Sequence, residues 1–305
     1  MRALLVVNPK ATTTSARARD VLAHALASEV KLDVVETTHR GHATELARQA
    51  SRDGLDVVVA LGGDGTVNEV TNGILHAGVQ PGLPALAVVP AGSTNVFART
   101  LGMPNNPIEA TSQLLEALLE DRRRTIGLAR ADDRWFTFNA GLGLDAGAVR
   151  RVERARAKGR TATQPLYVRS AVREYYYGPS HKHPLTVERD GAEPLQLALA
   201  LVCQTDPWTY LGDRPVRPCP DASFATGLDL FGLTKAPTAT VLRHLRQILS
   251  RRARPRGKHL VLLHDQPRLV LSSPVPLPFQ LDGDDLGDRS RVVLTAVPDA
   301  LRVVV

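Results

Sequence analysis

A short apolar run that ends in a glycine-rich turn constrains this fold more than any other feature. Residues 57–61 are β-branched or aliphatic without interruption, as expected of a parallel strand buried on both faces. The three glycines within residues 62–65 let the backbone turn sharply beside a ligand. Apolar residues then recur at helical spacing, which predicts Thr66 as the N-cap, with Glu69 three residues later. A strand, a glycine turn and a helix start are together typical of phosphate binding.

Asp64 is the unusual member of this stretch. Because another negative charge beside a polyphosphate is unfavourable, its carboxylate predicts a metal ion, a ribose or a proton to be held there. A structural alternative stays open, in which Thr66 and Glu69 form a capping box and Asp64 stabilises the turn.

Four apolar runs alternate with helical patterns in the first part of the chain, at residues 3–7, 32–36, 57–61 and 85–89. This alternation predicts a parallel sheet covered by helices, with a ligand at the carboxyl ends of the strands. The fourth run ends in a second polar stretch, residues 90–99, which reads PAGSTNVFAR.

Beyond about residue 125 the pattern changes to short alternating runs separated by turns, which predicts an all-β sandwich. The predicted fold class is therefore α/β plus all-β, with an α/β domain over residues 1–125 and a β-sandwich domain over residues 126–296. Residues 297–305 contain a final apolar run that is a candidate to complete the first domain.

The two polar stretches resemble the GGDGT and PxGTxNDFAR signatures of the diacylglycerol kinase catalytic family. That family includes bacterial lipid kinases and sphingosine kinases, with NAD kinases as distant relatives. The resemblance implies a Rossmann-like nucleotide-binding domain, ATP and Mg²⁺ as cofactors, and a C-terminal domain for the lipid substrate. It also implies Mg²⁺ at Asp64 together with the ATP phosphates, and the following ATP-binding residues: Asn8, Pro9, Thr38, Gly62, Gly63, Asp64, Gly65, Thr66, Asn68, Glu69, Gly92 and Ser93.

Three later segments extend the resemblance. Residues 139–146 resemble an NxxGxGxDA segment that leads into an Arg-rich helix at about residues 148–158. Residues 278–285, PFQLDGDD, resemble a QxDGE turn whose last carboxylate is the family's general base for the lipid hydroxyl, here Asp284. A plain hairpin turn without a catalytic role is the alternative explanation of the Asp-Gly-Asp sequence.

Residues 218–229 resemble the family's PxAxxDDGxLD segment, which in bacterial relatives holds a structural Mg²⁺. The matching positions here are Ser223, Thr226 and Leu228. Thr226 stands where the family has its charged Asp ligand, which puts this metal site in doubt because Mg²⁺ prefers anionic oxygen. Val96 likewise replaces a family Asp.

Composition limits the choice of partners and compartment. A net charge of +7 favours acidic partners, and the basic clusters at residues 150–160 and 251–258 are candidates to lie on an anionic membrane surface. A solvated face or loop is the open alternative for each cluster. Only 4% of residues are aromatic, without basic-aromatic interleaving, so nucleic acid is not expected. The absence of a secretory signal and of a run of about 20 apolar residues, and two cysteines without CxxC spacing, predict a cytoplasmic protein peripherally associated with the membrane.

The resemblance thus implies an ATP-dependent lipid kinase that phosphorylates diacylglycerol or a similar lipid alcohol, with Asp284 and Asp64 as catalytic residues. Alternatives that stay open are a sphingoid base or another acceptor, and a non-catalytic nucleotide- or lipid-binding regulator, since Val96, Thr226 and Asp284 depart from the family pattern. A homodimer is a further implication of the resemblance.

Overall fold

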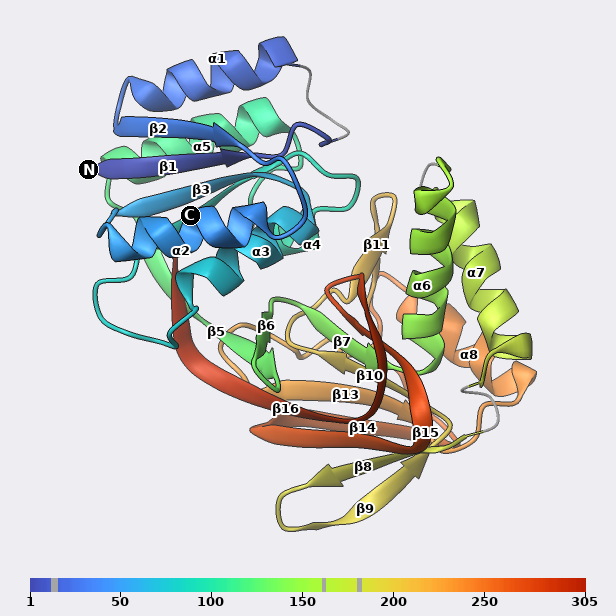
Figure 1. Ribbon diagram of the computed structural model, residues 1–305. Coiled ribbons are helices and arrows are strands. Elements are labelled where there is room, and N and C mark those ends of the chain that lie inside the picture. Colours follow the sequence, from blue (N-terminus) through green and yellow to red (C-terminus); the bar gives the residue numbers. More distant parts are fainter. Residues whose placement is uncertain (12–15, 161–162, 180–182) are drawn as a thin grey trace. The chain divides into compact units, whose positions relative to one another are not determined.

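The computed structural model describes residues 1–11, 16–160, 163–179 and 183–305, and these form two compact units (Figure 1). The first unit contains residues 1–127 and 299–305, and the second contains residues 128–298. The predicted helix start at residues 12–15 lies outside the described residues.

The sheet of the first unit is parallel, with the order β16-β4-β3-β1-β2. Val7 pairs with Leu61, which in turn pairs with Val89, so the strands end at one edge. Every residue of β3 and β4 is buried, as the uninterrupted apolar runs predicted. The strands are β1 (Arg2–Val7), β2 (Lys31–Glu36), β3 (Val57–Gly62), β4 (Ala85–Pro90) and the end of β16 (Asp284–Val304).

Helices of this unit pack in pairs, α1 with α5 and α2 with α3 (Figure 1). A Cβ on Gly73 of α3 would lie 2.5 Å from the carbonyl oxygen of Thr44 and 2.6 Å from Cβ of Ala47, so glycine allows α2 and α3 to approach closely. The helices are α1 (Ala16–Ala27), α2 (His42–Arg52), α3 (Asp64–Ile74), α4 (Val96–Thr100) and α5 (Pro107–Leu119).

The second unit is built on an antiparallel sheet with the order β14-β13-β10-β7-β15-β16, around a core of aliphatic residues and Phe136 and Phe279. The long strands β15 and β16 form a hairpin whose register shifts between Ser272 and Leu277. Strand β15 spans Arg268–Leu281, and β11 (Thr209–Leu211) and β12 (Arg214–Val216) form a separate two-stranded sheet. The remaining strands of this unit are β5 (Arg123–Ala131), which begins in the first unit, β6 (Arg134–Phe136), β7 (Asn139–Leu142), β8 (Leu185–Arg189), β9 (Ala192–Leu197), β10 (Leu199–Cys203), β13 (Leu228–Leu233) and β14 (Leu260–Gln266).

Three helices accompany this sheet: α6 (Leu144–Ala157), α7 (Gln164–Tyr177) and α8 (Thr238–Ile248). The predicted Arg-rich helix is α6, which begins four residues earlier than expected. It packs against α7 and against β7 and β15. The predicted fold class, an α/β half followed by a β half, is confirmed. Within the described ranges, no helix is long and apolar enough to span a bilayer.

Candidate functional site

Two glycine loops touch through their backbones at the carboxyl edge of the parallel sheet. A Cβ on Gly92 would lie 2.6 Å from Cα of Gly63, and a Cβ on Gly63 would lie 3.1 Å from Cα of Gly92. The amide of Ala91 also donates to the carbonyl oxygen of Gly62 at 2.8 Å. A side chain at residue 92 would therefore force the loops apart, and one at residue 63 would displace its neighbour by a few tenths of an ångström. The two sequence motifs form one surface.

Helix α3 begins at Asp64 with Gly63 as its N-cap, so the prediction of Thr66 as the N-cap was wrong. The carbonyl oxygen of Gly63 already accepts from the amides of Thr66 (2.9 Å) and Val67 (3.1 Å), and the helix therefore starts earlier. Thr66 has a different role: its Oγ1 accepts from Asn8 Nδ2 at 3.1 Å. This hydroxyl occupies the space beside Gly62, where an added Cβ would lie 2.4 Å from it.

The Asp64 carboxylate joins the two loops. Its Oδ2 accepts from the amide of Val96 at 3.0 Å, and its Oδ1 accepts from the amide of Phe97 at 3.1 Å. These amides belong to the first turn of α4, where the helix itself provides no acceptor. Asp64 therefore caps α4 and ties the second loop to the first.

Asn95 holds the second loop closed and was missed among the predicted site residues. It adopts a left-handed conformation, with φ 51° and ψ 49°, and is 3% exposed. Its Oδ1 accepts from the amide of Gly92 at 2.9 Å, and its Nδ2 donates to the carbonyl oxygen of Gly92 at 2.9 Å. The signal was present, since Asn95 matches the Asn of the second signature, but its role is to shape the backbone.

Glu69 braces a neighbouring helix and does not form the capping box with Thr66 that the sequence left open as a structural alternative. Its carboxylate accepts from the amides of Gly41 (2.9 Å) and Ala43 (3.2 Å), at the start of α2. No side chain within α2 caps this end, because its N-cap residue is Gly41. An acidic group at a helix N-terminus is stabilising, so the position of α2 depends on α3.

The remaining predicted ATP-binding residues divide into two groups. Thr38 and Ser93 are exposed in the loops after β2 and β4, and Pro9 follows β1. Asn68 is 1% exposed and accepts from Asn72 Nδ2 at 3.2 Å, so it faces the interior of its unit. The first group lies beside the glycine loops, whereas Asn68 and Glu69 belong to α3 and contact protein atoms.

Asp282 and Gly283 form the two-residue turn between β15 and β16, with φ values of 50° and 84°. The segment is a hairpin turn, since positive φ at both positions is typical of a type I′ turn. The buried Asp282 carboxylate accepts from Thr137 Oγ1 and from three amides, at 2.8–3.2 Å; the amides belong to Thr137, Phe138 and Asn139.

Asp284 is the first residue of β16 and is partly buried. The residues around it are firmly held: Arg150 of α6 binds Asp285 through Nε (2.9 Å) and Nη2 (3.1 Å), and Asp288 through Nη1 (2.6 Å). On the other side, Gln280 Oε1 accepts from the amide of Gly283 at 2.9 Å. The hairpin thus presents Asp284 from a braced backbone.

Asp145, another residue missed in the prediction, lies beneath this hairpin. Gln280 Nε2 donates to its Oδ2 at 3.0 Å, while its buried Oδ1 has no hydrogen-bond partner within the described residues. Burial raises the pKa of Asp145 to about 6, although hydrogen bonds from Gln280 and nearby amides act in the opposite direction. A Cβ on Gly141 would lie 1.7 Å from Asp145 Oδ2, so any side chain at residue 141 would collide with this carboxyl group.

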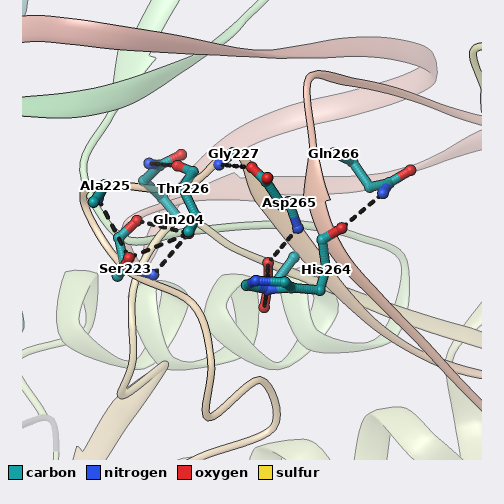
Figure 2. A network of polar contacts seen from close by, with 9 residues as sticks. Gln204, Ser223, Ala225, Thr226, Gly227, His264, Asp265 and Gln266 are labelled. Carbon is teal, nitrogen blue, oxygen red and sulfur yellow. Dashed lines mark hydrogen bonds and ion pairs between the residues drawn. The ribbon is translucent and has the colours of Figure 1, made fainter.

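The Ser223–Thr226 loop, shown in Figure 2, does not fit the structural Mg²⁺ site that the family implies. Thr226 Oγ1 donates to the carbonyl oxygen of Ser223 at 3.1 Å, and the amide of Thr226 donates to the same oxygen at 3.2 Å. One expected metal-binding carbonyl, at Ser223, is thus already hydrogen-bonded, and the Thr226 side chain is neutral. In the described ranges no cluster of three or more His, Cys, Asp or Glu is suited to a metal ion.

An ion pair lies beside this loop (Figure 2). His264 Nδ1 lies 2.9 Å and 3.0 Å from the two carboxylate oxygens of the buried Asp229. The hydrogen bond to Asp229 raises the pKa of the His264 imidazole. The pKa of Asp229 is also raised because burial outweighs the pairing with His264. Asp265, the next residue along β14, accepts from the amide of Gly227 at 2.7 Å.

The first part of the chain matches a known family. Residues 2–130 match the model of the diacylglycerol kinase catalytic domain. The matched part is less than half of the chain and contains both glycine loops. The hairpin with Asp284 lies outside it.

Two curated relatives show how far the similarity in sequence extends. A probable lipid kinase YegS-like protein of Chromohalobacter salexigens is 39% identical over 115 residues, which are 38% of this chain and 35% of the relative. A diacylglycerol kinase of Bacillus subtilis is 36% identical over 107 residues, 35% of this chain and 33% of the relative. The aligned part therefore spans about a third of the length of these curated relatives.

Solved structures extend the similarity in fold to both units. A putative diacylglycerol kinase from Bacillus anthracis matches with a TM-score of 0.79 and 20% identity, covering 99% of this chain and 96% of that one. An NAD kinase from Archaeoglobus fulgidus in complex with ATP matches with a TM-score of 0.55 and 11% identity, covering 100% and 94%. At these identities the similarity concerns the fold.

Proposed function

We propose that this protein is an ATP-dependent lipid kinase that phosphorylates the hydroxyl of diacylglycerol or of a similar lipid alcohol. The observation that carries the proposal is the backbone contact of the two glycine loops at the carboxyl edge of the parallel sheet, in a segment that matches the model of the diacylglycerol kinase catalytic domain. In open α/β sheets, ligands bind at this edge.

The open side of Gly65 supports a phosphate site at the start of α3. Among the described residues, no atom beyond its chain neighbours and its own helix backbone lies within 4 Å of a Cβ added there. Glycine in a helix costs up to about 1 kcal/mol relative to alanine, and packing gives no reason for that cost here. Close approach of a phosphate to the backbone would explain it. We assign Asn8, Pro9, Thr38, Gly62, Gly63, Thr66, Gly92 and Ser93 to the surroundings of ATP, with Asn68 and Glu69 behind them.

Asp64 is the proposed ligand for the Mg²⁺ that accompanies ATP. Its carboxylate provides the hard oxygen that Mg²⁺ prefers, and it is positioned by the amides of Val96 and Phe97. When bound, the ion would neutralise charge on the phosphates. Because Val96 has no side-chain oxygen, Asp64 is the carboxylate of the two signatures that can serve in this way.

Asp284 is the proposed general base for the acceptor hydroxyl. A carboxylate that accepts this proton makes the oxygen more nucleophilic as it attacks the γ-phosphorus of ATP, and ADP leaves. The bonds from Arg150 to Asp285 and Asp288, and from Gly283 to Gln280, hold the backbone on both sides of Asp284.

The test is phosphoryl transfer from γ-labelled ATP to mixed micelles of diacylglycerol, ceramide, sphingosine and monoacylglycerol. Wild type should label one of these lipids, and Asp284→Asn should lower turnover by about 100-fold or more while ATP binding is retained. Unchanged turnover in Asp284→Asn would remove this residue from the mechanism.

The same assay separates the alternatives. Label in sphingosine or monoacylglycerol alone would identify another acceptor of the same kinase class. ATP binding without a labelled lipid or lipid-dependent ADP release would favour the non-catalytic regulator. The altered position Val96 gives that alternative its support.

We further propose that the protein works in the cytoplasm at an anionic membrane surface, where lipid alcohols reside. Its net charge of +7 supports this, because basic residues near an anionic surface each contribute about 1 kcal/mol to binding. A homodimer stays a prediction.

A further inference from the structure

Helix α7 exposes an apolar stripe along its length. Val168 and Val172 are each 52% exposed, and Tyr176 is also 52% exposed. They lie four residues apart and therefore share one face of the helix. Tyr177, at the end of the helix, is 81% exposed. Large apolar side chains that gather on one exposed face are typical of an interaction site.

A cationic row runs beside this stripe. Arg169 and Arg173 are exposed and directly follow Val168 and Val172 in sequence, so the two rows lie side by side on α7. With Arg151 of α6, Val172 and Tyr177, they line an open cavity of about 570 Å³. Neither Arg169 nor Arg173 has an ion pair within the described part of the chain.

The opposite face of α7 is firmly packed, so the exposed rows are a fixed feature. Glu174 is 3% exposed and pairs with Arg151 at 2.7 Å. A Cβ on Gly147 of α6 would lie 2.4 Å from Cδ of Glu174, which shows how closely the helices approach. At the far end, Tyr175 Oη donates to the carbonyl oxygen of Ala236 at 2.7 Å, just before α8.

Charge identifies the partner that this face fits. Residues 144–177 contain eight Lys and Arg against three Asp and Glu, which is most of the excess positive charge of the chain. The exposed apolar side chains are valine and tyrosine, and tyrosine prefers the boundary between hydrocarbon and headgroups. A protein partner would be expected to cover the apolar row, but it would not require the exposed arginines, Arg169 and Arg173, beside it.

We propose that α7 is the membrane-docking surface of this protein and that its partner is an anionic lipid bilayer. Val168, Val172 and Tyr176 enter the interface, and Arg169 and Arg173 bind lipid phosphates, with the cavity beside Arg151 accommodating a headgroup. This inference rests on the proposed lipid kinase function, because docking at this face is how the chain would reach a lipid acceptor.

The test is co-sedimentation of the full chain with vesicles of phosphatidylcholine alone or mixed with phosphatidylglycerol. Wild type should bind the mixed vesicles at least about tenfold more tightly, and Arg169→Glu with Arg173→Glu should abolish this preference. Val168→Ser with Val172→Ser should weaken binding to both compositions. The control is Arg251→Glu with Arg252→Glu, an equal charge change at exposed residues of the other basic cluster, which should retain most of the preference.

Two outcomes would overturn the proposal. Equal losses in the α7 and control variants would mean that net charge, not this face, attracts the vesicles. A change from dimer to monomer in the serine variant, with vesicle binding intact, would make the stripe a contact between two copies of the chain. Phosphoryl transfer to a soluble short-chain diacylglycerol separates the docking proposal from the proposed kinase function. The α7 variants should keep this activity, because the soluble substrate does not require membrane binding. Absence of this activity in wild type would count against the kinase function and not against docking.

Discussion

The glycine loops of the first unit and the β15–β16 hairpin of the second both depend on carboxylates that accept from backbone amides, but they use them differently. In the loops, Asp64 binds the start of α4 and Glu69 binds the start of α2. In the hairpin, the buried Asp282 binds the chain between β6 and β7, two residues before the partly buried Asp284.

The difference concerns how structural and chemical roles are distributed among the carboxylates. In the hairpin the two roles are divided between neighbours: Asp282 holds the turn, and Asp284 is the proposed general base. In the loops both tasks fall to Asp64, which caps α4 and is also the proposed metal ligand. Loss of Asp64 should therefore disturb structure and catalysis together, whereas losses in the hairpin should be separable.

The largest effect is expected at Asp282. Asp282→Ala would leave three buried amides and a hydroxyl without their acceptor, and should lower the free energy of unfolding by about 3–5 kcal/mol. Asp284→Asn is the matched control and should change it by about 1 kcal/mol or less. Urea denaturation followed by circular dichroism measures both. Similar losses in the two variants would show that the division of roles is wrong.

A second prediction uses the pH dependence of Asp145. Its pKa is about 6 in the folded protein instead of 3.8, so the folded state holds this proton more tightly and stability falls as pH rises from about 4 through 6. Asp145→Asn cannot lose the proton. Its stability relative to wild type should therefore increase between pH 4 and pH 8, by about 3 kcal/mol at most.

Denaturation of both proteins across this pH range provides the measurement. Parallel stability curves for wild type and Asp145→Asn would exclude a buried, hard-to-ionise carboxyl group beneath the hairpin. His264 makes the stability of both proteins fall further at higher pH, because its raised pKa gives stability that is lost as pH rises above the ordinary histidine range. This contribution is the same in both proteins and cancels when their stabilities are subtracted.

The glycine loops provide a pair of alanine substitutions with opposite expected effects. Gly92→Ala places a Cβ 2.6 Å from Cα of Gly63 and should destabilise the protein by about 1–3 kcal/mol. Gly65→Ala meets open space in a helix and should stabilise it by up to about 1 kcal/mol. If ATP phosphates lie there, Gly65→Ala should nevertheless weaken ATP binding, as calorimetry can measure. Unchanged ATP affinity would move the phosphates away from Gly65.

The sequence made some of these features predictable and concealed others. Buried β3 and β4 followed from uninterrupted apolar runs, and the glycine motifs marked the loop edge. The capping by Asp64 and Glu69 was not predictable, because each carboxylate binds amides 26–33 residues away. Helix α7 was missed because its outward face is apolar, which obscures the usual amphipathic pattern.

The hairpin illustrates the same limit at closer range. Asp282 and Asp284 are the same residue type in one short motif, and only the tertiary partners of Asp282 reveal that it is structural. Asp145 could have been suspected from the NxxGxGxDA segment, but its pairing with Gln280 joins residues 135 positions apart. Local pattern finds the motif, and long-range contacts assign the roles within it.

The smallest effect is expected at the Ser223–Thr226 loop, where a hydroxyl replaces the carboxylate expected of a metal site. Thr226→Val keeps the shape but removes the bond to the carbonyl oxygen of Ser223, and should cost about 1 kcal/mol. Without ATP, the melting temperature of wild type should not change when EDTA replaces Mg²⁺. Thr226→Asp restores the charge, and only this variant should be stabilised by millimolar Mg²⁺. A wild-type protein that melts earlier in EDTA would mean that the loop holds a cation despite its neutral side chain.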